Sequence, residues 1–332
     1  MTVESLPKVE LHVHLEGTAT PELVQRLADR NDMPLPERLI NEHGRFHYGD
    51  FLDFLRTYDM AASVIRTGED YRDITYEYLR ACAAEGAIYV ELTASPDHAR
   101  LVGLTDEEHL DGIARGIDDA RRLHGIEGRI LISAVRNFGL EQALAVARYA
   151  AAERHPYVVG FSMAGDEANF PIADFAGAYA IAAEAGLGCT VHAGEWAGPD
   201  SVRAALTLPV TRIDHGVRAI EDASLVTELA QREMVLNTCP TSNVVLGVFP
   251  GFDDHPLPRL RDAGVRLTLG SDDPPYFGAT IGGEYRVCAE HLGFSEEELT
   301  AVTLTAIDAA FCDDALKAAL RARVTDPAHP RA

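Results

Sequence analysis

The chain has 332 residues, a formal net charge of −23 and a hydrophobic content of 47%. This length is within the range of one α/β barrel with insertions, and the hydrophobic content is sufficient for a large core. The strong negative charge argues against nucleic acid or an anionic membrane surface as a partner, and it favours a neutral or cationic small molecule.

The start of the chain and its cysteines bear on the compartment. No basic leader with an apolar run precedes the first predicted strand, and no apolar stretch is long enough to span a bilayer. The five cysteines are scattered, without a C-x-x-C pair, which predicts reduced thiols in the core. We therefore expect a cytoplasmic protein with no membrane partner; the oligomeric state is left open.

The first predicted strand covers residues 8–14 and contains two histidines. Because side chains alternate along a strand, His12 and His14 should lie on one side, with Val13 opposite. Two imidazoles on one face suit a metal ion. A pair of solvated histidines on a half-exposed strand is the alternative interpretation at this point.

Strands and helices then alternate along the chain. A helix is predicted at 21–30, with Thr20 as its N-cap, and the sequence is predicted to stay helical from about Phe46 to Glu85. Further helices are predicted at 106–124, 140–153 and 172–185. The predicted strands lie at 8–14, 87–93, 129–135, 158–163, 188–192, 212–215, 235–238 and 266–270.

Eight strands separated by helices predict an α/β fold, a (β/α)₈ TIM barrel with a helical insertion after the first strand. No Pro/Gly/Ser linker, repeat or low-complexity segment divides the chain, so residues 1–332 are expected to form one metal-dependent barrel domain. Polar residues are found at the carboxyl ends of the strands, where barrels have their active sites.

The strand at 188–192 ends in a histidine, His192, which is followed three residues later by Glu195. Alone, such a pair is more often a solvated loop. Other strand ends, however, supply more histidines and an Asp-Asp pair to the same mouth. Three imidazoles and one carboxylate suit a single zinc ion with an open position for water. We assign the ligands as His12, His14, His192 and Asp272, which leaves Glu195, His215 and Asp273 for general acid–base chemistry.

The lysine content bears on the number of metal ions. Two-metal barrels of the amidohydrolase type usually bridge their metals with a carboxylated lysine at the end of strand four. This chain has only Lys8 and Lys317, and neither can lie there. A bridging Asp or Glu is the alternative, but one zinc ion per chain is the simpler prediction.

Six short segments follow one another in a specific order: residues 6–17, 164–167, 192–195, 214–216, 239–243 and 271–274. From its first strand to about Phe311, the chain resembles the adenosine deaminase family of amidohydrolases. The resemblance implies the same four zinc ligands. It also implies that Glu195 donates a proton to purine N1, that His215 orients the hydrolytic water, that Asp273 contacts the purine and that Gly165 offers it a backbone group.

A raised pKa would keep Glu195 protonated near neutral pH, and a closed apolar pocket would raise it. The helices after strand one are expected to roof this pocket through Phe51, Phe54 and Tyr58. The predicted substrate-binding residues are His14, Glu16, Gly165 and Asp273.

The expected reaction is zinc-dependent hydrolytic deamination of a 6-aminopurine, and two positions disagree about the substrate. Nucleoside-specific relatives usually have Asp at position 16, whereas Glu16 is typical of relatives that deaminate free adenine. Those adenine-specific relatives usually carry Ser-Ser-Glu after strand four, where this chain has a glycine, Gly165. We expect adenosine and deoxyadenosine to be converted to inosine and deoxyinosine, because Gly165 should border the base.

Other functions fit the sequence less well. Adenine deaminase, or a deaminase of another 6-aminopurine nucleoside, is the alternative within the family. A cytidine-deaminase site needs P-C-x-x-C, whereas Cys239-Pro240 continues as Thr241-Ser242-Asn243. A phosphoesterase would want a basic pocket and would leave Glu195 unexplained. A non-catalytic purine-binding protein is expected to have lost Glu195 or a ligand, and none is missing.

Overall fold

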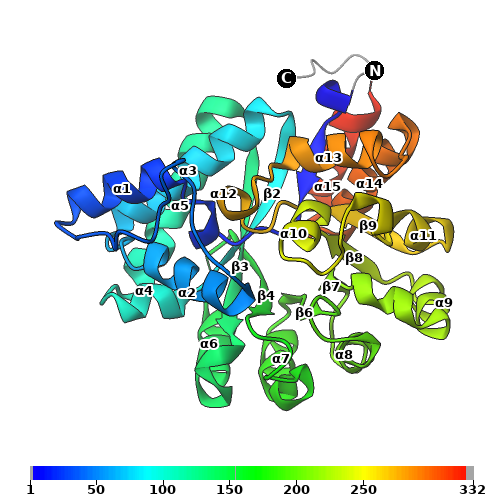
Figure 1. Cartoon of the computed structure of the whole chain (residues 1–332), viewed down its shortest axis with the longest axis horizontal. Coiled ribbons are helices and arrows are strands. Elements are labelled where there is room, and N and C mark those ends of the chain that lie inside the picture. Colours follow the sequence, from blue (N-terminus) through cyan, green and yellow to red (C-terminus); the bar gives the residue numbers. More distant parts are fainter. Residues whose placement is uncertain (1–2, 154, 327–332) are drawn as a thin grey trace.

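The computed structural model describes residues 3–153 and 155–326, and its parallel strands stand at the centre with helices around them (Figure 1). The strands form two sheets, in the orders β1-β2-β3-β4-β5 and β6-β7-β8-β9. Their bounds are β1 Lys8–Glu10, β2 Ala87–Ala94, β3 Glu127–Val135, β4 Val158–Ala164, β5 Gly188–Cys189, β6 His192–Ala193, β7 Arg212–His215, β8 Val235–Thr238 and β9 Arg266–Leu269.

Backbone hydrogen bonds join these two sheets into one ring. On one side, the His14 N–H donates to the Asp272 carbonyl at 3.0 Å, next to β9. On the other side, the Thr211 N–H, next to β7, donates to the Cys189 carbonyl of β5 at 3.2 Å, and the Thr190 N–H, just after β5, donates to the Phe161 carbonyl of β4 at 3.1 Å. The strand predicted at 188–192 is therefore divided into β5 and β6, although Thr190 between them still pairs. The predicted (β/α)₈ barrel is confirmed.

The helices pack outside the strands and follow the predicted alternation. The predicted helices at 21–30 and 106–124 have the predicted bounds, and Thr20 caps the first by accepting the Leu23 N–H at 3.2 Å. Helix bounds are α1 Pro21–Arg30, α2 Phe51–Ala62, α3 Gly68–Ala84, α4 Pro96–Leu101, α5 Asp106–His124, α6 Leu140–Ala152, α7 Ala176–Glu184, α8 Pro199–Ala205, α9 Ala223–Gln231, α10 Pro240–Val245, α11 Leu257–Asp262, α12 Pro274–Phe277, α13 Ile281–Glu290, α14 Glu296–Ala309 and α15 Asp314–Thr325. Short 3-10 helices at Val3–Ser5, Glu16–Thr18, Arg136–Phe138, Ile172–Phe175, Val217–Glu221 and Phe252–Asp254 complete the elements.

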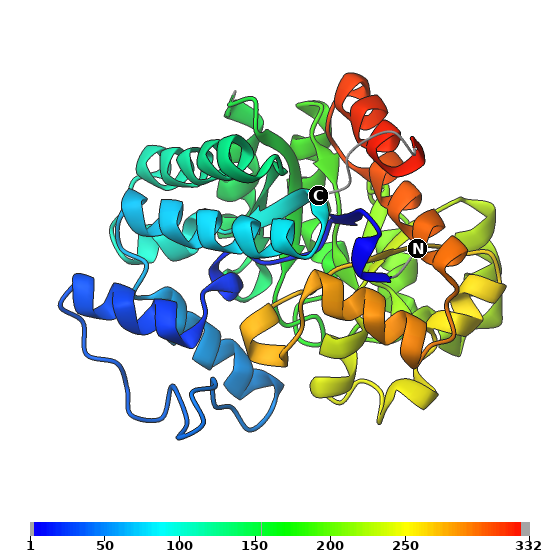
Figure 2. The ribbon, with the colours of Figure 1, turned by 90° about the horizontal axis from the view of Figure 1, so that it is seen from above.

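The prediction of continuous helix from Phe46 to Glu85 is wrong, because side chains cap two separate helices within it. Asp50 accepts the Asp53 N–H at 2.8 Å and starts α2, and Thr67 starts α3 with a capping box. Figure 2 shows the irregular connection between α1 and α2 at the edge of the molecule. The insertion after the first strand therefore places α2 as a short, separate helix beside the barrel mouth.

Two features of the described residues agree with the sequence analysis. Lys8 lies at the start of β1, where its ammonium donates to the carbonyls of Leu6 and Glu85 at 2.9 and 2.8 Å, and Lys317 lies on α15. Neither lysine is at the end of β4. The five cysteines are buried and free.

Among the helices that the structure describes, none is long and apolar enough to cross a membrane.

Candidate active site

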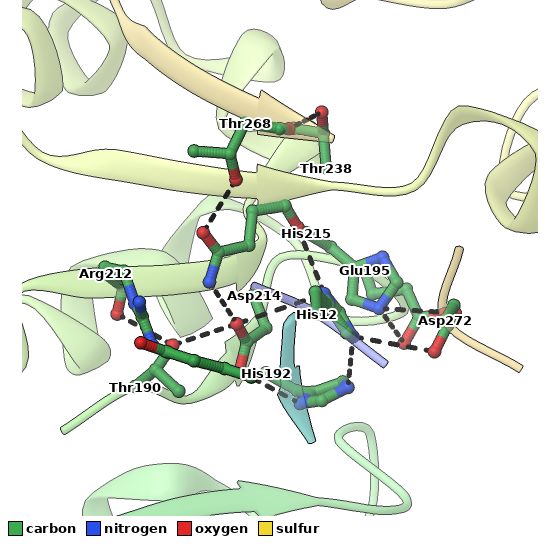
Figure 3. Close-up of polar contacts among 12 residues, drawn as sticks. His12, Thr190, His192, Glu195, Arg212, Asp214, His215, Thr238, Thr268 and Asp272 are labelled. Carbon is green, nitrogen blue, oxygen red and sulfur yellow. Dashed lines mark hydrogen bonds and ion pairs between the residues drawn. The ribbon is translucent and has the colours of Figure 1, made fainter. Parts of the chain in front are cut away.

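Four side chains predicted as metal ligands converge at the barrel mouth: His12 and His14 just after β1, His192 at the start of β6 and Asp272 just after β9. Figure 3 shows His12, His192 and Asp272 facing one another. The Nε2 atom of His192 lies 3.2 Å from that of His12 and 3.1 Å from that of His14. The Oδ1 atom of Asp272 lies 3.5 Å from His12 Nε2 and 3.3 Å from His14 Nε2. One atom from each residue thus belongs to a cluster whose members all lie within 4.8 Å of one another.

The chemistry of this cluster fits a zinc ion. Zinc–nitrogen bonds of about 2.0–2.1 Å in a tetrahedron separate neighbouring nitrogens by roughly 3.3 Å, close to the spacing of these imidazoles. The His12 Nδ1 atom lies 3.1 Å from the Asn237 carbonyl, which holds the proton on Nδ1 and leaves Nε2 free for a metal. Burial, followed by the charges of His12 and His14, lowers the pKa of His192 well below its usual range, so its imidazole is neutral.

The carboxylate ligand is held by its own contacts. Asp272 has a left-handed backbone, with φ of 64°, which is uncommon for a residue with a side chain and is often found at functional sites. Ser242 Oγ donates to its Oδ2 at 2.6 Å. Burial opposes ionisation, but the adjacent imidazoles of His12 and His14 hold the pKa of Asp272 well below its usual range. Asp272 is therefore a carboxylate anion.

Glu195 lies beside this cluster without belonging to it. Its side chain is buried, with 6% of the residue exposed. Burial, followed by the negative charges of Asp272 and Glu167, raises the pKa of Glu195 well above its usual range. A carboxyl group with a raised pKa can donate a proton near neutral pH, which is the property required of a general acid.

His215, at the end of β7, faces the same space. Asn243 Nδ2 donates to His215 Nδ1 at 3.2 Å, which places the imidazole proton on Nε2. That Nε2 lies 3.6 Å from Glu195 Oε2 and 3.8 Å from Asp272 Oδ2. Burial and neighbouring imidazole charge lower the pKa of His215 to about 3, so a neutral ring presents an N–H donor between the two carboxyl groups.

A cavity with an empty volume of about 690 Å³, partly open to solvent, lies over the cluster and is also lined by Glu195 and His215. Helix α2 forms one wall through Phe51, Phe54 and Tyr58, where the sequence analysis expects a roof. The Phe51 ring packs on Trp196 with centroids 4.7 Å apart. Aromatic side chains of α2 therefore cover the segment that carries Glu195.

Glu16 lines the cavity and is buried, with 2% of the residue exposed. Its Oε1 accepts the Ser95 N–H at 3.1 Å and the Tyr71 hydroxyl at 3.3 Å, while the Tyr58 hydroxyl lies 3.4 Å from Oε2. Burial opposes ionisation, but the nearby imidazoles of His109, whose Nε2 lies 3.8 Å from Oε1, and His98 lower the pKa of Glu16. Glu16 is therefore an anion and can only accept hydrogen bonds.

Gly165 and Asp273 also line the cavity. Gly165 has φ of 103°, and a Cβ atom added there would lie 2.4 Å from Asn137 Oδ1, so backbone geometry itself requires glycine. Burial, followed by the charges of Asp272 and Glu195, raises the pKa of Asp273 well above its usual range. Its Oδ1 is buried and has no hydrogen-bond partner among the described residues.

Three residues near the site have no role in the sequence analysis. Asp214 accepts from Asn237 Nδ2 at 2.8 Å, and its Oδ2 lies 3.6 Å from His192 Nδ1. In the sequence, the position of Asp214 next to His215 in a matching segment is the one indication that it belongs to the site. Glu167, in another matching segment, contacts the chain around Glu195. Arg136 is fully buried and donates to the His192 carbonyl, and the sequence around it carries no comparable signal.

The parallel barrel and the polar cluster at its mouth define a hydrolase of the amidohydrolase type. A family model described as adenosine deaminase matches residues 7–327. The chain therefore belongs to the adenosine deaminase family, and the predicted resemblance is confirmed. It is a hydrolase that acts on C–N bonds of cyclic amidines, and its reaction is the hydrolytic deamination of a purine.

Individual relatives extend this comparison over nearly the whole chain. A protein named adenine deaminase from Chelativorans sp. (strain BNC1) is 48% identical over 320 residues, which cover 96% of this chain and 98% of the relative. The crystal structure of adenine deaminase from Arthrobacter aurescens is 32% identical, with a TM-score of 0.90 over 96% of this chain and 98% of that one. An amidohydrolase structure from Burkholderia ambifaria with bound Zn is 28% identical, with a TM-score of 0.87 over 96% and 90%.

Proposed function

We propose that the protein is a zinc-dependent adenine deaminase, which converts adenine and water to hypoxanthine and ammonia. The relatives named adenine deaminase favour this alternative over the adenosine and deoxyadenosine substrates that the sequence analysis expects. The structural observation that carries the proposal is the buried anion of Glu16 on the wall of the cavity.

Glu16 supports a free base through its hydrogen-bonding character. Free adenine has an N–H on its five-membered ring, where a nucleoside has a bond to the sugar. A desolvated carboxylate gains more from such a donor than it would gain in water, because the surroundings are less polar. Gly165 no longer argues for a nucleoside. Its φ of 103° and the nearby Asn137 require glycine at this position whatever the substrate is.

We assign the zinc to His12, His14, His192 and Asp272, with one ion per chain. When bound, zinc would lower the pKa of a coordinated water from 15.7 towards about 7. One ion would suffice because neither lysine lies at the end of β4 and these four side chains converge on a single site. We also treat the whole chain as one deaminase domain.

The remaining side chains supply proton transfer and orientation. Glu195 donates its proton to purine N1, which makes C6 electrophilic, and the water oxygen then adds to C6. His215 orients the water through Nε2, and Asp273 contacts the purine through its free carboxyl oxygen. One proton of the water passes to the amino group and the other restores the Glu195 carboxyl group, so the C6–N bond breaks and ammonia leaves. His14 and Gly165 border the substrate from the cavity wall.

The proposal is tested with protein purified without added metal. Elemental analysis should find one zinc per chain, and ammonia should form stoichiometrically with hypoxanthine when adenine is supplied. Adenosine and deoxyadenosine are assayed in parallel. Ammonia from the nucleosides but not from adenine would overturn the substrate assignment, and adenine binding without ammonia release would indicate a non-catalytic purine-binding protein.

A further inference from the structure

The carboxylate of Glu167, just after β4, holds the segment that follows β6. The residue is buried, with 3% exposed. Its two oxygens accept four consecutive backbone N–H groups, those of residues 194–197; the distances for Glu195, Trp196 and Ala197 are 3.1, 2.9 and 3.1 Å. The hydroxyl of Ser201 donates to the same carboxylate.

This arrangement constrains the backbone more strongly than ordinary loop contacts do. Successive N–H groups that point to one side form a concave anion site, and here the anion is a side chain of the protein itself. Hydrogen bonds to an ionised acceptor are roughly twice as strong as neutral ones, and burial removes competing water. The turn also needs Gly194, because its φ is 73° and an added Cβ would lie 2.3 Å from Val202 Cγ2.

A second buried charge holds the other end of the same segment. The guanidinium of Arg136 donates to the His192 carbonyl, at the start of β6. Arg136 is fully buried and lies within the electrostatic influence of both Glu167 and Glu195. The backbone on both sides of Glu195 is therefore held by ionic side chains from the neighbouring β3 and β4 ends of the barrel.

We propose that Glu167 is a positioning residue for deamination: it fixes the backbone at 194–197 so that the Glu195 carboxyl is held for proton transfer to the purine ring. This inference rests on the proposed function of Glu195 as the general acid. Glu167 is not among the residues that line the cavity, so it acts through the backbone at 194–197 and not by contact with the reacting atoms.

The position of the acid matters because catalysis depends on sub-ångström placement. A shift of about 1 Å in a reacting group can lower the rate by about 10²-fold. Glu167→Gln keeps the side chain's size but replaces one accepting oxygen with an NH₂ group that faces N–H donors. We expect kcat to fall by about 10- to 100-fold, with KM and the zinc content unchanged. Amide hydrogen exchange at residues 194–197 should become faster in this variant.

Asp166→Asn is the matched control, because it makes the same charge change on the neighbouring residue. Within residues 3–153 and 155–326, the Asp166 side chain accepts hydrogen bonds only from the backbone and side-chain nitrogens of Asn169, at 3.1 and 2.7 Å, and from none of residues 194–197. This variant should keep the wild-type kcat. Ser201→Ala, which removes one donor and leaves the carboxylate in place, provides a milder second test and should lower kcat by a smaller factor.

Each outcome is measured on the 6-aminopurine that the wild type deaminates fastest. A Glu167→Gln enzyme with full zinc, wild-type kcat and unchanged amide exchange would overturn the positioning role and leave the proposed function intact. Loss of zinc from this variant would overturn it as well, by placing the effect on the ligand His192. If the variant does not fold, wild-type kcat in Ser201→Ala decides against the inference. A wild type that releases no ammonia from any purine refutes the proposed function separately, while amide exchange still reports on the backbone.

Discussion

Replacing Glu195 with glutamine removes the proposed proton donor and keeps the size of the side chain. Only 6% of Glu195 is exposed, and aromatic residues of α2 cover the neighbouring segment, so bulk water has little access as a substitute acid. General acids typically contribute ~10²–10⁴-fold to the rate. This range corresponds to roughly 2.7–5.4 kcal/mol on the activation barrier, at 1.36 kcal/mol per tenfold. Because Glu195 itself is buried, we expect the upper half of this range.

The assay follows the absorbance change of purine deamination at saturating substrate, with zinc measured in the same samples. Glu195→Gln should retain one zinc ion, and Glu107→Gln, on the exposed first turn of α5, is the control with normal activity. The pKa of Glu195 is raised by burial and nearby negative charge, and the protonated form is the active one. The wild-type rate should therefore fall as pH rises through this pKa, and the variant should lack this decline. A zinc-loaded Glu195→Gln enzyme with wild-type kcat would refute the assignment.

Three further substitutions test other parts of the site. His192→Ala should lose zinc and activity together, and elemental analysis showing full zinc would contradict its assignment as a ligand. Glu16→Gln should keep zinc but lower kcat/KM for adenine. The loss should correspond to roughly 1.5–3 kcal/mol of transition-state stabilisation, the value of a hydrogen bond to a charged group. An unchanged kcat/KM would count against the contact between Glu16 and the base. Gly165→Ala should lower the free energy of unfolding by about 1–3 kcal/mol, because φ of 103° strains an alanine; equal denaturation midpoints and slopes would contradict this.

The sequence predicts the barrel and the meeting of the polar residues because both follow from local periodicity. Alternation along the first strand predicts that His12 and His14 share a face. β1 itself ends at Glu10, and the segment beyond it pairs through isolated bridges from Val13 to Asp272 and from His14 to Thr93. The carboxyl ends of parallel strands meet at one mouth, which brings His192 and Asp272 to the same cluster.

Features that depend on contacts between distant segments were not predictable in the same way. The four N–H groups that face Glu167 come from residues 27 to 30 positions later, and no periodic pattern encodes that approach. The break between α2 and α3 depends on the caps Asp50 and Thr67, whose side chains compete with continued helix. The backbone conformation of Gly165 is likewise set by tertiary structure, which no local sequence pattern encodes.

The central claim is that this site deaminates the free base, and the ratio of kcat/KM for adenine to kcat/KM for adenosine tests it most directly. Both values are measured on the same zinc-loaded preparation under the same conditions. If the ring N–H of adenine donates to Glu16, a hydrogen bond of roughly 1.5–3 kcal/mol predicts a ratio on the order of ten to a hundred in favour of adenine. A kcat/KM for adenosine that equals or exceeds the value for adenine would contradict the account.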